Sequence, residues 1–332
     1  MNGGIQLKTR HIVGIVALLA SLLAGCAVIP LQGAQEPGKI TIAMGFVPNV
    51  QFAPMYVALE RGYFEEEGID VTLDYGMETD LLQRVGTGDV RFAVASGDQV
   101  ILARASDLPV RYFLNWYRRF PVCVVSMADK GITSPEDLVG KTVGIPATEG
   151  ASYIGWLAFL EQVGISRKDV NLQTIGYTQV SSLVEDRVDA AVCYAMNEPV
   201  QLEADGHEIN VFYLDEYTNL VSNGLITNAE TIGEYPDLVR GVARAFLRGL
   251  EDTLDDPDAA FEITREAIPE MEDETAELQR EVLGACLDFW RAESPGKSSP
   301  EAWEESVDAL TTFGLLTEEI EPEFLYTNEF ID

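Results

Sequence analysis

A regular alternation of short strand-like segments with helical segments starts at Lys39, and it narrows the choice of fold more than any other feature. Three segments carry the apolar and β-branched residues of buried or half-buried strands: residues 40–44 (ITIAM), 69–73 (IDVTL) and 90–95 (VRFAVA). Residues 55–61 and 81–85, which lie between them, have helical character. Alternation of this kind produces βαβ units and a mainly parallel sheet, so we expect an α/β fold.

The same pattern occurs twice along the chain. A Leu-Glu pair begins at Leu59 and again at Leu160, and each is followed at similar spacing by a glycine and two strand-like segments. We therefore expect two similarly built α/β lobes, with boundaries near residues 117–126 and 214–225. In this division lobe 1 comprises residues 39–120 and 221–332, and lobe 2 comprises residues 121–220.

After Asn228 the sequence predicts mainly helices. Apolar residues recur at helical spacing in residues 236–254, 278–290 and 303–313, and we expect these helices to pack on lobe 1. The final segment, residues 319–332, is acidic, and we expect it to be peripheral.

The first 26 residues have the form of an export signal. Lys8 and Arg10 precede an apolar run at residues 12–23, which is short for a membrane span and typical of a secretory signal peptide. The run ends in Leu23-Ala24-Gly25-Cys26, which resembles the bacterial lipobox. We therefore expect a signal peptide at residues 1–25, a lipidated Cys26 and a flexible tether to residue 38, with an uncleaved anchor as the alternative.

The remaining cysteines and the histidines argue against metal and histidine chemistry. Cys123, Cys193 and Cys286 lie far apart in apolar settings, which indicates buried free thiols, and no CxxC motif is present. The two histidines are His11, within the signal segment, and His207, in a turn-like stretch. Two such positions do not make a two-histidine metal site, and we expect no cofactor or metal.

The charge balance argues against two kinds of partner. The chain has 22 Lys and Arg against 55 Asp and Glu, for a net charge of −33. Affinity for nucleic acids and for anionic lipid surfaces comes largely from Lys and Arg, so neither kind of partner is expected to bind through charge. The acidity itself is typical of a surface that keeps copies soluble and apart.

Three segments of the chain resemble a known group of proteins. Residues 45–64 (GFVPNVQFAPMYVALERGYF), 138–145 (LVGKTVGI) and 222–225 (SNGL) resemble the substrate-binding proteins of ABC importers, in the group of thiamin-pyrimidine, sulfonate and riboflavin binders. The resemblance covers about residues 39–248. It implies a two-lobed periplasmic-binding-protein fold, type II-like, with a hinge and a ligand cleft between the lobes. It also implies a small-molecule ligand and an ABC permease as partners, at the outer face of the cell membrane.

The family places its ligand contacts on loops that follow strand ends, where open α/β sheets generally bind ligands. The residues of this sequence at those positions are Asn49, Gln51, Phe52, Tyr56, Ser96, Asp98, Asn115, Trp116, Tyr117, Ser152, Tyr153, Tyr177, Tyr194, Asn197, Glu198 and Asn223. The run of residues 149–152 is expected to open a helix whose N–H groups point at a polar ligand group. For each aromatic residue the alternative role is packing in the protein core. For Glu198, which precedes Pro199, the alternative role is to open a helix.

The candidate set combines aromatic rings with amides, hydroxyls and a few carboxylates, which suits a neutral heteroaromatic ligand. An anion binder would use a placed Arg or Lys. Arg118 and Arg119 are the basic pair nearby, and we expect them to be surface charges beside the hinge, so sulfonate and nitrate rank lower. Riboflavin is the favoured ligand, and a thiamin-pyrimidine precursor is the alternative.

Two other classes of function remain as alternatives. An enzyme is disfavoured because the chain carries an export signal and lacks the cysteine-rich signature of the fungal thiamin-pyrimidine enzymes that this family resembles. A purely adhesive or structural lipoprotein would not need a two-lobed fold with a cleft.

Overall fold

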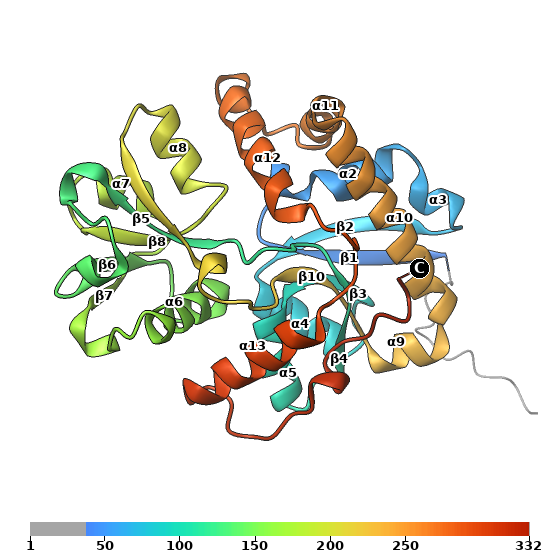
Figure 1. Ribbon diagram of the computed structural model, residues 1–332. Helices are drawn as coiled ribbons and strands as arrows, with labels where there is room; N and C mark the ends of the chain where they lie inside the picture. The colour runs from blue at the N-terminus through green and yellow to red at the C-terminus, as the bar shows by residue number, and fades with distance from the viewer. Residues whose placement is uncertain (1–37, 332) are drawn as a thin grey trace, which may run out of the picture. The chain divides into compact units, whose positions relative to one another are not determined.

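The computed structural model (Figure 1) describes residues 38–331. The predicted signal peptide, Cys26 and most of the predicted tether lie outside the described residues. The described residues fall in one compact unit, so the predicted division into two lobes stays a prediction. The strands of this unit nevertheless fall into two separate five-stranded sheets.

The first sheet is built from the strands that the alternation predicts and from two more. Its order is β2 (Asp70–Gly76), β1 (Lys39–Gly45), β3 (Phe92–Ser96), β10 (Asn223–Asn228) and β4 (Val110–Asn115). Strand β1 pairs in parallel with β2 and β3, as a βαβ pattern requires. Strand β10 returns from far along the chain and pairs antiparallel with both β3 and β4.

The second sheet repeats this construction. Its order is β7 (Asn171–Thr174), β6 (Thr142–Ile145), β8 (Ala190–Tyr194), β5 (Val122–Met127) and β9 (Ile209–Tyr213). Strand β6 pairs in parallel with β7 and β8, and β5 pairs antiparallel with β8 and β9. The weak repeat in the sequence therefore corresponds to a repeated strand order. It missed β5 and β10, because both lie in segments that we expected to run extended between lobes.

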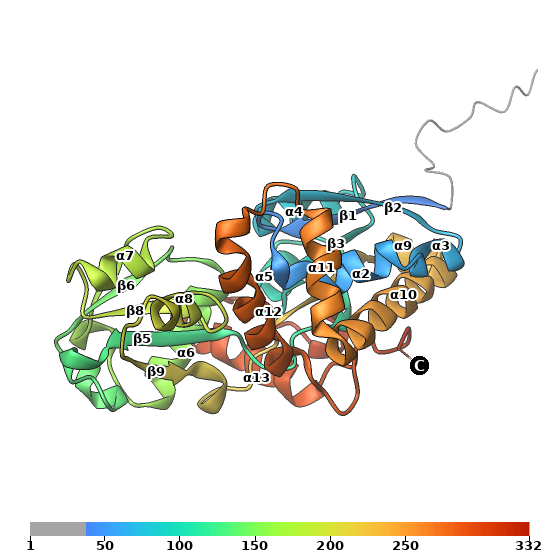
Figure 2. The same cartoon turned by 90° about the horizontal axis from the view of Figure 1, so that it is seen from above.

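Both faces of the first sheet are buried. Successive side chains of a strand point to opposite faces, so the clusters that they join show what covers each face. Ile40, Ile42 and Met44 of β1 join one apolar cluster, whereas Ala43 joins the other. Helices α4 (Glu78–Gly86) and α5 (Gly97–Ala105) pack against the strands. Helix α10 (Pro236–Asp255) lies along α2 (Ala53–Glu60) and α3 (Tyr63–Glu66) in both views (Figure 1, Figure 2). This confirms the α/β expectation.

The second sheet is covered in the same way. Helix α6 (Gly150–Gln162) contributes Trp156 to the cluster that contains Val122 and Val124 of β5. Helices α7 (Gln179–Val184) and α8 (Glu198–Ala204) contribute to the cluster that contains Cys123 and Val125 of the same strand. Helix α6 and the pair α7 and α8 therefore cover opposite faces, as Figure 1 shows.

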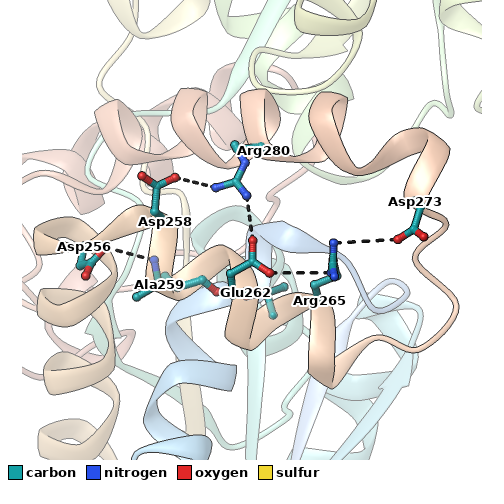
Figure 3. A network of polar contacts seen from close by, with 9 residues as sticks. Asp256, Asp258, Ala259, Glu262, Arg265, Asp273 and Arg280 are labelled. Atoms are coloured by element: carbon teal, nitrogen blue, oxygen red, sulfur yellow. Dashed lines mark hydrogen bonds and ion pairs between the residues drawn. The ribbon is translucent and has the colours of Figure 1, made fainter.

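The helices after β10 are α9 (Ala229–Glu234), α10, α11 (Pro257–Ala267), α12 (Ala276–Trp290) and α13 (Pro300–Thr312). An ion-pair network joins α11 to α12 (Figure 3). Arg280 contacts Asp258 at 2.5 Å and Glu262 at 2.8 Å, and Arg265 lies 3.8 Å from Glu262. These side chains are largely exposed, so each pair contributes at most about 1 kcal/mol and the network mainly fixes how the two helices lie together.

The C-terminal segment corrects one expectation. Residues 319–331 are not peripheral, because the N–H of Tyr112 in β4 donates to the carbonyl of Leu325 at 2.9 Å, and Thr327 N–H donates back to Tyr112. Leu325 and Phe330 are buried at 0% and 1% exposure. Strand β4 is the edge of its sheet, and its free backbone groups and apolar face are covered by this segment despite the segment's acidic composition.

Short 3₁₀ segments also occur along the chain: η1 (Val50–Phe52), η2 (Ala128–Lys130), η3 (Pro135–Leu138), η4 (Arg167–Asp169), η5 (Leu214–Glu216), η6 (Asp273–Thr275) and η7 (Pro322–Phe324).

The expectation for Cys123, Cys193 and Cys286 is confirmed, since all three are free and buried and burial raises the pKa of each thiol well above its ordinary value. Among residues 38–331, every helix is too short or too polar to span a bilayer.

Candidate functional site

The loop after β1 supplies the first part of the site. Asn49 organises this loop, because its Oδ1 accepts the Gln51 N–H at 2.9 Å and its Nδ2 donates to the Val47 carbonyl at 2.7 Å. Both polar groups of Asn49 are therefore used within the turn. The loop begins at Phe46, whose φ of 97° lies in the left-handed region that favours glycine. A strained and exposed aromatic at the end of a strand is a feature of functional loops.

Two contacts join this loop to loops of the second sheet. The Nε2 of Gln51 donates to Oδ1 of Asn197, just before α8, at 2.7 Å. The ring of Phe46 lies 5.6 Å from the ring of Tyr177, which follows β7 and is 66% exposed. The structure therefore brings Gln51, Asn197 and Tyr177 to one place, where the carboxyl ends of β1, β7 and β8 face each other.

Two carboxylates lie where β2 and β3 end. Glu78 opens α4, and its Oε1 accepts the Ser96 hydroxyl at 2.7 Å as well as the Ser96 N–H. Asp98 opens α5 and is 3% exposed; its Oδ2 accepts Gln99 Nε2 at 2.8 Å, and its Oδ1 has no partner in the described structure. Burial, and then the charge of Asp98, raises the pKa of Glu78 to about 7. Burial likewise raises the pKa of Asp98.

Tyr194 brings the second sheet to this carboxylate pair. Burial raises the pKa of its phenol, and the charges of Glu78 and Asp98 raise it further, so the phenol lies within electrostatic range of both carboxylates. A hydrogen bond joins Tyr194 to Asn223, at the start of β10. The Tyr194 N–H donates to Oε2 of Glu198 at 2.9 Å, so Glu198 fixes the turn that leads into α8. Helix α8 starts at Glu198, in agreement with the alternative role of opening a helix before Pro199.

Aromatic rings extend from this point along the first sheet. Phe52 lies 6.2 Å from Tyr75, the penultimate residue of β2, and 6.1 Å from Trp116. The hydroxyls of Tyr75 and Tyr56 are 2.7 Å apart, which orients both rings. Tyr75 is partly exposed whereas Tyr56 is 4% exposed, so Tyr75 presents the larger free surface.

Trp116 and Tyr117 are placed in the protein core. They are 1% and 5% exposed, and Trp116 packs edge-on against Phe246 at 4.9 Å and beside Trp290 at 5.8 Å. Arg118 and Arg119, which follow them, are more exposed. Trp116 supports Phe52 from the core side. Its part in ligand contact stays a prediction.

The remaining candidates take less central positions. Asn115 accepts the Tyr112 hydroxyl at 2.9 Å. Ser152 and Tyr153 lie in the first turn of α6, which starts at Gly150 as expected and packs against α5. No hydrogen bond or ring contact found among residues 38–331 joins Ser152 or Tyr153 to the Gln51–Asn197 contact.

Sequence reasoning missed Phe46, Tyr75 and Glu78. Tyr75 and Glu78 flank the end of β2, and the rule that places ligand contacts after strand ends applied to them as well as to the residues that we selected. Glu78 was overlooked because an acidic residue in the first turn of a helix is common.

Two surface hollows lie elsewhere. One is lined by α13 and the loop after it, and the other lies beside Gly68 and the start of β2. Neither contains a candidate residue. Within the described part of the chain, no group of three metal-ligating side chains comes together.

Comparison with known proteins places the chain. It matches the family described as NMT1/THI5 like over residues 49–260, which begins at Asn49 and includes every ligand-binding candidate selected from the sequence. The chain belongs to the NMT1/THI5-like family. Its fold is that of periplasmic binding proteins.

Several NMT1/THI5-like relatives and fold neighbours are informative. The riboflavin-binding protein RibY of Chloroflexus aurantiacus is 41% identical over 301 residues, 88% of this chain and 86% of the relative. A formylaminopyrimidine-binding protein of Halalkalibacterium halodurans is 30% identical and covers 95% of this chain and 98% of its own length. At lower identity the chain matches proteins named 4-amino-5-hydroxymethyl-2-methylpyrimidine phosphate synthase. The periplasmic aliphatic sulphonate binding protein of Escherichia coli shares the fold with a TM-score of 0.72, 14% identity, and coverage of 90% of this chain and 100% of its own.

The carboxylate pair predicts how the stability of this NMT1/THI5-like protein depends on pH. The pKa values of Glu78 and Asp98 are raised on folding, and burial raises that of Glu198 too, so the folded protein keeps protons that the unfolded chain has lost. The free energy of unfolding therefore decreases as pH rises from about 4.5, the pKa of a carboxyl in the unfolded chain, through the raised pKa values of these groups in the folded protein. Between pH 5.5 and 8 we expect a loss of about 1–3 kcal/mol in the free energy of unfolding.

The measurement is urea unfolding at the two pH values. Glu78→Gln should remove part of the loss, whereas Asp80→Asn, an exposed change on the same helix, should keep all of it. An identical pH dependence in the wild type and in Glu78→Gln would contradict this assignment. Ordinary carboxyls are already charged above about pH 5.5 and so do not contribute to this interval.

Proposed function

We propose that this chain captures riboflavin outside the cytoplasm and delivers it to the permease of an ABC importer. The observation that carries the proposal is the pairing of aromatic rings with uncharged amides and carboxylates at the facing strand ends of the two sheets. Phe52 and Tyr75 supply rings from the first sheet, and Tyr194 supplies a ring from the second. A tricyclic ring system stacks on such surfaces, at about 0.5–1.5 kcal/mol for each aromatic pair beyond the area buried. The similarity to RibY supports the same ligand.

Capture is proposed to work by closure of the two sheets around the ligand. The Gln51–Asn197 hydrogen bond and the Phe46–Tyr177 contact would form only in the closed state. The segments that connect the sheets are tied together by Arg119, whose Nε lies 2.5 Å from Oδ2 of Asp215. A ligand that contacts both sides shifts the equilibrium toward the closed form by its difference in affinity for the two states. The permease would then recognise the closed form.

The second candidate ligand is a thiamin-pyrimidine precursor. It is favoured by the similarity to the formylaminopyrimidine-binding protein, which spans more of the chain than the similarity to RibY does. A single small ring would need fewer aromatic walls than the structure offers. Sulfonate and nitrate rank below both, because no Lys or Arg lies among the contacts described for the site.

Mass spectrometry of the ligand that co-purifies with the protein from its native cells tests the proposal. We expect riboflavin at close to one molecule per chain. A pyrimidine without any flavin would overturn the choice of ligand and leave the import function standing. Turnover of the bound vitamin by the purified protein would instead support an enzyme.

We further propose that the chain is a lipoprotein anchored through Cys26 to the outer face of the cell membrane. Replacing Cys26 by Ser should move the protein from the membrane fraction to the soluble fraction, since the acyl chains supply the anchor. Immunoblotting of the fractions measures this, and Cys123→Ser, a change of a buried thiol in the fold, serves as the control that stays with the membrane. A Cys26→Ser protein that still sediments with membranes would contradict the anchor.

A further inference from the structure

One carboxylate oxygen beside the candidate site is buried and lacks a partner. Asp98 is 3% exposed, its Oδ2 accepts a hydrogen bond from Gln99, and its Oδ1 has none among residues 38–331. Buried polar atoms in native proteins are nearly always hydrogen-bonded, because leaving one unpaired is costly. When Asp98 is ionised, its unpaired oxygen can only accept, so the group that completes the carboxylate is a hydrogen-bond donor.

A second carboxylate stands next to it. Glu78 lies close enough to Asp98 for the charge of one to affect the other. The Oε1 of Glu78 is occupied by the two donors of Ser96, and none of the ion pairs within residues 38–331 includes either carboxylate. The place is therefore rich in acceptors and lacks a neutralising cation.

The aromatic walls reach the same place. Tyr75 lies three residues before Glu78 at the end of β2 and contacts Phe52, while the phenol of Tyr194 from the second sheet lies within electrostatic range of both carboxylates. A ligand ring held between these walls would direct any attached chain toward Glu78 and Asp98.

We infer that Glu78 and Asp98 form a subsite that binds the hydroxyl-bearing chain of an uncharged ligand and rejects the same ligand when its chain ends in phosphate. The inference rests on the proposed function and names the part of the ligand that this pair selects. A chain of hydroxyls supplies several donors to the free oxygens of both carboxylates. A terminal phosphate brings up to two negative charges and acceptor oxygens to the same place, where repulsion opposes it.

The experiment compares the binding of riboflavin and riboflavin 5′-phosphate by the full-length protein at pH 8, above the pKa of about 7 of Glu78. We expect the wild type to bind riboflavin at least about 100-fold more tightly than the phosphate. Asp98→Asn and Glu78→Gln should each narrow this ratio by about 10-fold, chiefly by admitting the phosphate. Asp80→Asn removes the same charge from the exposed side of α4 and should leave the ratio unchanged.

A second ligand pair separates this inference from the choice of riboflavin. If riboflavin does not bind, 4-amino-5-hydroxymethyl-2-methylpyrimidine and its phosphate are compared in the same four proteins. If the protein binds the uncharged pyrimidine more tightly than its phosphate, and if this affinity ratio is smaller in Asp98→Asn, riboflavin is refuted as the ligand and the subsite is supported. Equal binding of an uncharged ligand and its phosphate, an unchanged ratio in both carboxylate variants, or binding of neither uncharged ligand overturns the inference.

Discussion

Replacing Trp116 by Ala is expected to lower the free energy of unfolding by about 3–5 kcal/mol, the range for a large buried aromatic. Trp116 is 1% exposed and contacts Phe52, Phe246 and Trp290, so its loss leaves a cavity that several rings line. Urea unfolding followed by circular dichroism measures the change. Trp116→Phe fills part of the cavity and should cost less, which keeps the test usable if the alanine variant does not fold.

The control for this prediction is Phe324→Ala, because Phe324 is 54% exposed and its removal should cost less than about 0.5 kcal/mol. A small loss of stability in Trp116→Ala together with a large loss of ligand affinity would place Trp116 in the binding wall and not in the core. That result would restore the role that the sequence suggested for it.

Replacing Tyr194 by Ala is expected to raise the Kd for riboflavin by about 30-fold or more, equivalent to about 2 kcal/mol. Tyr194 is an aromatic of the second sheet within electrostatic range of the carboxylate pair, so in the proposed site its loss removes one wall and its hydrogen bond to Asn223. Tyr194→Phe keeps the ring and loses the hydroxyl that bonds Asn223, and it should weaken binding much less. Calorimetry at one pH measures all of these affinities.

Tyr217→Ala is the matched control for Tyr194→Ala. Tyr217 is also partly buried, but its ring packs edge-on against Phe159 at 5.0 Å, away from the carboxylates. Its loss should lower stability and leave the Kd within about twofold. If Tyr194→Ala bound riboflavin as the wild type does, the second sheet would not form a wall at this position.

The fold was predictable where local pattern and tertiary structure agree. Strands β1 and β3 are rich in apolar residues and β2 alternates apolar with polar residues, so each was found within a few residues of its true bounds. The C-terminal segment was misplaced because its acidic residues conceal Leu325 and Phe330, which are buried in the core. A free sheet edge is a property of the whole fold, and no local pattern reveals what will cover it.

The candidate site was partly predictable for a similar reason. Gln51 and Asn197 were selected because they follow strand ends, and the structure joins them across the two sheets. The proximity of Glu78 to Asp98 was not foreseen. Glu78 lies 20 positions earlier in the sequence, and the two come together only because β1 pairs with both β2 and β3. Burial also could not be inferred for Trp116, since the sequence shows its polar neighbours but not α12, which packs over it.

Titration of the purified protein with riboflavin, followed by flavin fluorescence, tests the central claim most directly. Stacked aromatic walls predict strong quenching of the flavin emission that saturates at one molecule per chain, and Tyr194→Ala should weaken both the quenching and the affinity. Unchanged emission over the whole titration, with tight binding of an aminopyrimidine measured by calorimetry, would contradict the claim that this chain is a riboflavin receptor.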